Sequence, residues 1–319
     1  MNRRTFLGVA VGVAGLNRGA RAAPIPIIDT HIHLFDPRRP EGVPWPPQND
    51  TFLYQPALPD RYRRLTQALG IVGAIEVECS NRVEDNQWVL DIAGQDTIMV
   101  GTVGNLEPGT PDFRKHLERF HRNPLFRGIR YGNLWGRNFG EQVSRPEFIS
   151  DLKVLAEASL GLDTAQPDPA LVANVVRLTD QIPSLRVVID HLPQLEPPSD
   201  PQALRAYQGN VRELGKRPQV YVKVSEVLRR VGGQVRTDLD FYRPRLDELW
   251  DIFGAERLIY GSDWPNSDHF GTYPQVLKVV REYFLGKGTA VAEKFFWRNS
   301  IAAYHWVKRA PSQPQPYAT

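Results

Sequence analysis

Short apolar runs alternate with amphipathic stretches along most of the chain after Pro24. Eight apolar runs predict β-strands, with the ranges Ile25–His33, Ile71–Glu78, Ile98–Leu106, Phe126–Asn133, Leu160–Gln166, Arg186–Pro193, Val220–Val227 and Leu258–Pro265. Several runs are almost continuously apolar, which is typical of strands in a buried parallel sheet. The pattern therefore predicts a sheet that is covered on both faces.

Helical periodicity fills the segments between these runs. The predicted helices are Val83–Gly94, Pro111–Arg122, Pro146–Ala158, Pro169–Gln181, Pro201–Lys216, Asp238–Gly254, Pro274–Gly286 and Thr289–Trp306. Several begin with proline, which suits the first helical turn. A strand–helix unit that recurs eight times favours an α/β fold of the TIM (β/α)8 barrel type in a single domain. A doubly wound sheet is the alternative, but neither a GxGxxG motif nor a P-loop supports it.

Three segments fall outside this repeat. Residues 1–23 combine the pair Arg3-Arg4, a short apolar run and the site Ala20-Arg21-Ala22, which together predict a twin-arginine signal peptide. Residues 36–60 are rich in proline and follow the first strand, so they form either a lid or pocket wall, or a rigid surface loop. Residues 310–319 predict a disordered tail, which leaves residues 24–309 for the barrel.

Charge and cysteine content narrow the classes of function. The signal holds four arginines and no acidic residue, so its removal changes the formal net charge from +3 to −1. The mature chain therefore gives no reason to expect a nucleic-acid partner. The apolar run of the signal is too short to span a membrane, and we expect twin-arginine export to the periplasm or the medium. Cys79 is the single cysteine, so any metal must be bound by histidines and carboxylates.

The first strand ends in the clearest chemical signal, Asp29-Thr30-His31-Ile32-His33. Side chains at i and i+2 of a strand share a face, so His31 and His33 should both point into the barrel at its carboxyl end. Two imidazoles in this arrangement can bind one divalent metal ion. Two histidines on a solvated strand edge are the alternative.

Two further strands end in residues of the same kind. His191 follows the apolar run of the sixth strand, and Asp263 lies at the end of the eighth. We expect His191 and Asp263 to act as metal ligands and catalytic residues, with Asp263 taking a proton from water. A structural histidine and a helix-capping aspartate are the alternatives.

Four other residues are candidates for substrate binding. Arg130 ends the fourth strand and could pair with a substrate carboxylate, although an ordinary salt bridge is equally consistent with its position. Lys223 and Ser225 share one face of the seventh strand and could contact substrate, or could pack inside the barrel. Trp264 could offer an apolar platform to a sugar ring.

Taken together, D-x-H-x-H on the first strand, D-H on the sixth and G-S-D-W-P on the eighth resemble the amidohydrolase superfamily. Within it, the chain is similar to the amidohydrolase-related group that contains L-fuconolactonase, L-rhamnonolactonase and 2-pyrone-4,6-dicarboxylate lactonase. Asp36-Pro37-Arg38-Arg39-Pro40, Gly128-Ile129-Arg130 and Lys223-Val224-Ser225 add to this similarity. The resemblance implies a TIM barrel with a metal bound by His31, His33, His191 and Asp263.

The chain departs from the pattern of two-metal members. These carry a bridging lysine or glutamate on the fourth strand, where this chain has Arg130, and a histidine on the fifth strand, which is missing here. The resemblance thus implies one divalent metal, with zinc favoured over manganese. Catalysis without a metal stays open, because some members of the lactonase branch are thought to work without one.

The expected function is hydrolysis of a small sugar lactone or carboxylated lactone by an activated water, with Asp263 as general base. A decarboxylase of the same superfamily is the alternative. A non-catalytic periplasmic binding protein is a third reading, but a binder has no reason to keep a general base. A small-molecule substrate is the expected partner, and a homo-oligomer stays open.

Overall fold

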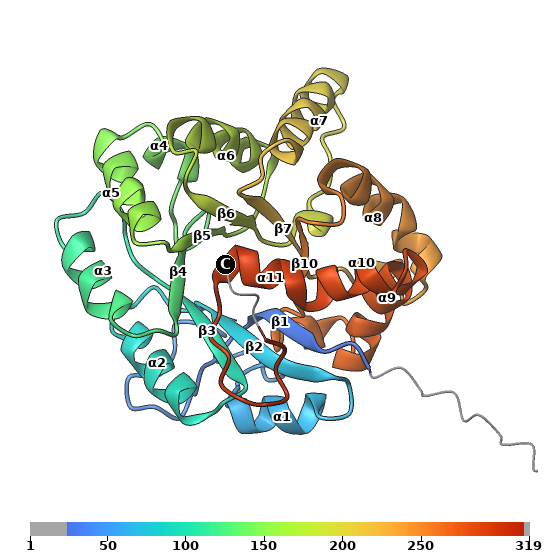
Figure 1. Ribbon diagram of the computed structural model, residues 1–319, viewed down its shortest axis with the longest axis horizontal. Coiled ribbons are helices and arrows are strands. Elements are labelled where there is room, and N and C mark those ends of the chain that lie inside the picture. Colours follow the sequence, from blue (N-terminus) through green and yellow to red (C-terminus); the bar gives the residue numbers. More distant parts are fainter. Residues whose placement is uncertain (1–23, 316–319) are drawn as a thin grey trace, which may run out of the picture.

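Eight parallel strands, hydrogen-bonded in chain order, form the centre of the computed structural model, which describes residues 24–315. They are β1 (Ile27–Ile32), β2 (Ile71–Val77), β3 (Met99–Gly104), β4 (Phe126–Arg130), β5 (Gly161–Thr164), β6 (Arg186–Ile189), β7 (Val220–Val224) and β10 (Leu258–Tyr260). Helices surround the strands (Figure 1). The predicted TIM barrel is confirmed.

The barrel closes where β1 meets the segment after β10. The backbone N–H of His33 donates to the carbonyl of Trp264, and the N–H of Asp263 donates to the carbonyl of His31, both at 2.8 Å. The buried Asp29 carboxylate reinforces this seam, because Oδ1 accepts from the backbone of Ser262 and Oδ2 from the hydroxyls of Tyr62 and Tyr273, each at 2.8 Å. The first residue of the D-x-H-x-H motif thus holds the barrel closed.

The outer ring consists of helices, several of which begin with proline or a capping aspartate. They are α1 (Pro59–Thr66), α2 (Asp85–Gln95), α3 (Phe113–His121), α4 (Phe139–Gln142), α5 (Pro146–Glu157), α6 (Pro169–Gln181), α7 (Pro201–Gly215), α8 (Leu239–Phe253) and α9 (Tyr273–Gly286). The side chains of Asp168, Asp200 and Asp238 accept hydrogen bonds from backbone N–H groups in the first turns of α6, α7 and α8. These bonds satisfy donors that have no partner inside the helix.

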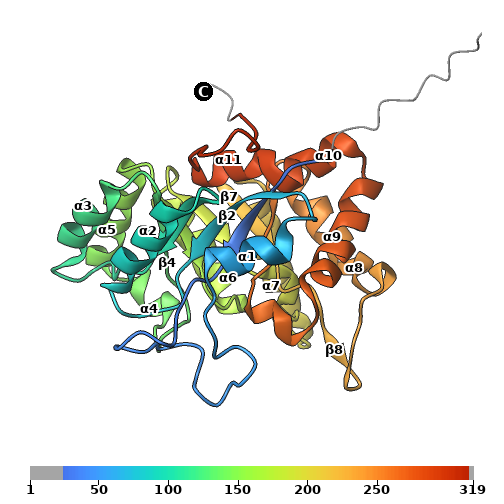
Figure 2. The same ribbon diagram turned by 90° about the horizontal axis from the view of Figure 1, so that it is seen from below.

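The two ends of the barrel are covered differently (Figure 2). At one end lie α10 (Thr289–Glu293) and α11 (Asn299–Tyr304), joined by a π-helical segment, Lys294–Arg298, that interrupts the single helix expected over 289–306. At the other end the chain extends as the long loop after β1 and as a hairpin of β8 (Arg230–Val231) and β9 (Gln234–Val235). The carboxyl ends of the strands, where barrels carry their sites, lie at this second end.

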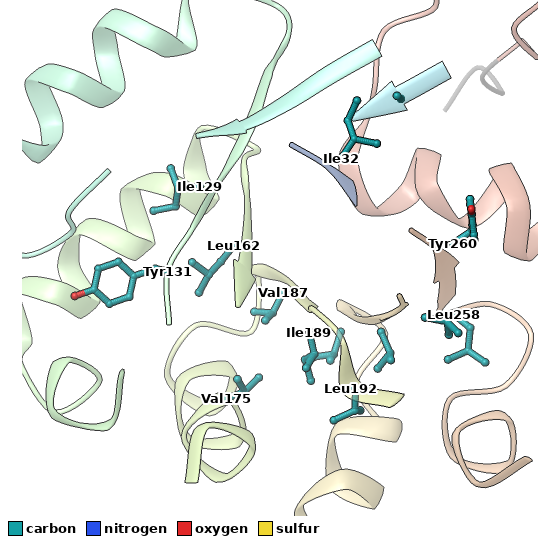
Figure 3. Close-up of a cluster of buried hydrophobic side chains, with 14 of the residues drawn as sticks. Ile32, Ile129, Tyr131, Leu162, Val175, Val187, Ile189, Leu192, Leu258 and Tyr260 are labelled. Atoms are coloured by element: carbon teal, nitrogen blue, oxygen red, sulfur yellow. The ribbon is translucent and has the colours of Figure 1, made fainter. Parts of the chain in front are cut away.

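Alternation along the strands separates the apolar core from the interior of the barrel. Ile129, Leu162, Val187 and Ile189 belong to the main cluster of buried apolar side chains, together with Val175 of α6 (Figure 3). Neighbouring residues on a strand point to opposite faces. The barrel interior therefore receives the residues next to them, which include several charged side chains.

Parts of the expected domain boundaries need correction. Residues 310–315 pack against the barrel rather than forming a disordered tail, because buried Gln313 donates from Nε2 to the carbonyls of Val72 and Thr97 at 3.0 and 2.7 Å. Residues 316–319 and the predicted signal, residues 1–23, lie outside the described part of the chain. Among the described helices, none is long and apolar enough to cross a membrane.

Candidate active site

The two histidines of β1 meet Asp263 at the carboxyl end of the barrel. Asp263 Oδ1 lies 3.1 Å from His33 Nε2 and 3.3 Å from His31 Nε2. His33 is fixed by a hydrogen bond of 2.7 Å from Nδ1 to the carbonyl of Val77, which leaves the lone pair on Nε2. The shared face expected for His31 and His33 is confirmed.

His191 completes the group from the end of β6. Its Nε2 lies 3.8 Å from Asp263 Oδ1, and its Nδ1 lies 2.7 Å from Ser225 Oγ. Burial lowers the pKa of His33 to about 4 and lowers the pKa values of His31 and His191 well below the ordinary range. All three imidazoles are therefore neutral at neutral pH and can offer a lone pair.

Asp263 is a buried carboxyl group with few counter-charges. Burial raises its pKa to about 7, and the Asn266 amide, which donates to Oδ2 at 2.7 Å, opposes this shift. A carboxylate with a pKa near neutrality can accept a proton from water and return it within one catalytic cycle. The burial of Asp263 and its raised pKa are compatible with proton transfer to and from water.

A pocket with a volume of about 470 Å³ opens above these residues, which is within the usual range for small-molecule sites. Its lining consists of His33, Trp45, Cys79, Arg130, Leu134, Trp135, Gln166, Pro167, His191, Gln194, Glu226, Asp263 and Asn266. Trp45 comes from the proline-rich segment 36–60 and its ring centre lies 5.5 Å from that of His33. This segment therefore supplies part of the pocket wall.

Three of the expected substrate contacts are wrong. Lys223 is completely buried beneath the pocket, where Nζ lies 2.7 Å from Asp163 Oδ2, 2.8 Å from Asp190 Oδ1 and 3.2 Å from His31 Nδ1. Ser225 is also completely buried and contacts His191 instead of the pocket.

Trp264 is the third residue whose expected role the structure does not support. Its side chain is fully buried against Tyr62, with ring centres 5.3 Å apart, and it does not line the pocket. The reason is that its backbone is fixed in the seam that closes the barrel, which directs the indole away from the pocket.

Arg130 reaches the pocket wall, but its charge is already paired. Its Nε donates to Asp190 Oδ2 at 3.0 Å, and Nη1 donates to the carbonyl of Glu78 at 3.3 Å. Its Nη2 lies 3.4 Å from His191 Nε2. Arg130 therefore links the strand-4 end to the histidines, as well as bordering the pocket.

Sequence reasoning missed Glu226 and Asn266. Asn266 Nδ2 donates to Glu226 Oε1 at 2.8 Å and to Asp263 Oδ2 at 2.7 Å, so one amide holds two carboxyl groups. Burial, followed by contact with Asp263, raises the pKa of Glu226 well above its usual value. Their positions directly after Lys223-Val224-Ser225 and G-S-D-W-P were the available signal.

The donor set suits a single cation. His31, His33 and Asp263 offer ligand atoms within 4.8 Å of one another, and so do His191, Glu226 and Asp263. His31 Nε2 is buried without a hydrogen-bond partner among the described residues, and His33 Nε2 and Asp263 Oδ1 face each other as two acceptors. Such an arrangement is stabilised by a proton or a metal ion placed between the acceptors.

Comparison with known proteins agrees with this geometry. Residues 28–306 match the model of the amidohydrolase family. An L-fucono-1,5-lactonase from Burkholderia ambifaria is 30% identical over 252 residues, which are 77% of this chain and 83% of that protein. An L-fucono-1,5-lactonase from Burkholderia multivorans is 24% identical over 86% of this chain and 94% of that protein. The fold resembles that of an amidohydrolase from Burkholderia multivorans solved with bound zinc, which is 22% identical, with a TM-score of 0.76 over 88% of this chain and 99% of that one.

Proposed function

This chain belongs to the amidohydrolase family, and on that premise we propose that it is a hydrolase that opens a sugar lactone by attack of a water molecule. The observation that carries the proposal is the position of Asp263, a buried carboxyl group with a pKa of about 7 at the base of an open pocket. The two lactonase relatives support the choice of a cyclic ester as the substrate.

Asp263 acts as general base in this proposal. It accepts a proton from the attacking water and then donates it to the ring oxygen that leaves as the lactone opens. The neutral imidazole of His191 lies beside it and is oriented by its contact with Ser225 Oγ. Asn266 keeps the Asp263 carboxylate in a fixed orientation by its hydrogen bond to Oδ2.

We further propose that one divalent metal ion, zinc in preference to manganese, is held by His31, His33, His191 and Asp263. The fit rests on three neutral imidazoles that converge on one carboxylate, with Asp263 Oδ1 lying 3.1, 3.3 and 3.8 Å from Nε2 of His33, His31 and His191. When bound, the ion would polarise the substrate carbonyl and lower the pKa of the attacking water.

The pocket favours a neutral, hydroxylated lactone over a carboxylated one. A substrate carboxylate requires a positive charge, but Arg130 is already paired with Asp190. The wall carries the amides of Gln166, Gln194 and Asn266, which can bind hydroxyl groups. Trp45 and Trp135 add apolar rings against which the C–H groups of a sugar can pack.

The test measures hydrolysis of a panel of sugar lactones and carboxylated lactones by the purified protein, with proton release as the readout. We expect turnover of neutral sugar lactones, loss of activity after chelation and recovery with zinc. Activity that is indifferent to chelation would keep the lactonase and reject the metal. No turnover of any lactone, together with carbon dioxide release from carboxylic acids, would instead support the decarboxylase alternative.

A further inference from the structure

Backbone strain is concentrated around the pocket. Among residues 24–315, seven residues other than glycine have a positive φ, and five of them line the pocket, namely Trp135, Gln166, His191, Glu226 and Asp263. Each of the five follows a different strand of the barrel. Because left-handed backbone is unfavourable for residues with a side chain, such residues persist where their position serves a function.

Glu226 has a left-handed backbone conformation, as His191 and Asp263 do. Its φ is 47°, compared with 53° for His191 and 63° for Asp263. In an extended strand, Ser225 and Glu226 would point in opposite directions. The left-handed turn at Glu226 instead allows Ser225 to contact His191 while the Glu226 side chain still reaches the pocket.

The Glu226 carboxyl group accepts a hydrogen bond through Oε1 and also lies in contact with the Asp263 carboxyl group. Oε1 accepts from Asn266 Nδ2, the same nitrogen that donates to Asp263. Oε2 has its closest recorded basic partner in His191 Nδ1 at 3.8 Å, which is beyond hydrogen-bond distance. Among the described residues, neither an arginine nor a lysine forms a salt bridge with Glu226, although only 12% of its side chain is exposed. A carboxyl oxygen is therefore held at a set position beside the general base.

We propose that Glu226 is a specificity-determining residue whose Oε2 binds a hydroxyl group of the substrate lactone. This inference rests on the proposed lactonase function. A carboxyl group can accept a hydrogen bond in either protonation state, so the role does not depend on whether Glu226 is charged. The shared Asn266 amide fixes the distance between this oxygen and Asp263, and hence between the recognised hydroxyl and the carbonyl that water attacks.

A purely structural role for Glu226 makes a different prediction. If Glu226 only held Asn266 and through it Asp263, its removal would slow the hydrolysis of every lactone to the same degree. If Oε2 binds a substrate hydroxyl, its removal must slow hydroxylated lactones more than a lactone without hydroxyls. The preference between two substrates therefore separates the two roles.

The experiment compares kcat/KM on a hydroxylated sugar 1,5-lactone and on δ-valerolactone for the wild type, Glu226→Leu, Glu226→Gln and Asp263→Asn. We expect Glu226→Leu to reduce the preference for the hydroxylated lactone at least tenfold, and Glu226→Gln, which retains an acceptor, to recover most of it. Asp263→Asn is the matched control, because it removes the general base but leaves Glu226 and its hydrogen bond to Asn266 in place. It should slow both substrates and keep their ratio within about twofold.

The outcomes separate this inference from the proposed function. Hydrolysis of neither lactone by the wild type would reject the proposed function and this inference with it. Hydrolysis of both by the wild type, with an unchanged ratio in Glu226→Leu, would reject the role of Glu226 alone. Thermal unfolding checks that each variant is folded, and Glu226→Ala replaces the leucine variant if that variant is not.

Discussion

Strand β7 and the residues directly after it contribute to two layers of the barrel, which differ in whether their charged groups are paired. Lys223 lies in a buried lower layer, in which it contacts Asp163 and Asp190, and Tyr304 also donates to Asp163 at 2.7 Å. Three residues later, Glu226 lies in the pocket layer with a left-handed backbone and one carboxyl oxygen without a basic partner in bonding range.

The difference shows that the lower layer stabilises the fold, whereas the pocket layer contains groups held in unfavourable states. In the lower layer, opposite charges meet at short distances, which limits the cost of burying them. In the pocket layer, five residues keep an unfavourable backbone conformation and Asp263 keeps a pKa near neutrality. We infer that the paired layer serves as a rigid base on which the strained layer can be maintained.

The largest expected effect comes from breaking the lower layer. Lys223→Met removes the ammonium group from between two buried carboxylates, and we expect a loss of about 3–5 kcal/mol in the free energy of unfolding, measured by urea denaturation. Lys216→Met is the control, because Lys216 forms an exposed pair with Glu213 and should change stability by less than about 1 kcal/mol. Similar losses in the two variants would contradict the comparison.

Asp263→Asn should remove the general base from the pocket layer while leaving the fold intact. We expect kcat to fall by about 10²-fold or more, since the general base is lost. In the wild type, kcat/KM should decrease as the pH falls and Asp263 is protonated, at a pH of about 7 without a metal and at a lower pH when a cation is bound.

Stability should depend on pH in the opposite direction. In the metal-free protein, the pKa of Asp263 is higher in the folded chain than in the unfolded chain, so its contribution to stability is present at acidic pH and is lost as the pH rises towards about 7. Asp263→Asn should lack both pH dependences, whereas Asp180→Asn on the surface should retain them. If Asp263→Asn kept the wild-type kcat, Asp263 would not be the general base.

The smallest expected effect tests the strain itself. Gln166→Gly and Ser159→Gly each relieve a positive φ, of 50° and 57°, and should stabilise the protein by about 1 kcal/mol. Only Gln166 lines the pocket, so its variant alone should lower kcat/KM on a hydroxylated lactone, by about threefold to tenfold, the range expected for one hydrogen bond. Equal activities of the two variants would argue that the Gln166 amide does not bind substrate, and an unchanged stability of both would argue that their positive φ values carry no cost.

The sequence was sufficient to predict the barrel and the group that meets at its centre. Eight apolar runs correspond to the eight strands, and His31, His33, His191 and Asp263 lie together as expected. Both inferences rest on local rules, namely the period of a strand and the fact that parallel strands end on the same side. The twin-arginine signal and export stay predictions, as does a homo-oligomer.

The tertiary structure alone decided which residues reach the pocket. The period of two correctly placed Lys223 and Ser225 inside the barrel, but it carries no information about depth, so their burial beneath the pocket was not predictable. Likewise, the left-handed backbone at Glu226 and Gln166 is not marked in the sequence by a glycine at either position. Local patterns determine the face of a strand on which a side chain lies, whereas its depth and the path of the chain beyond the strand depend on packing against the rest of the barrel.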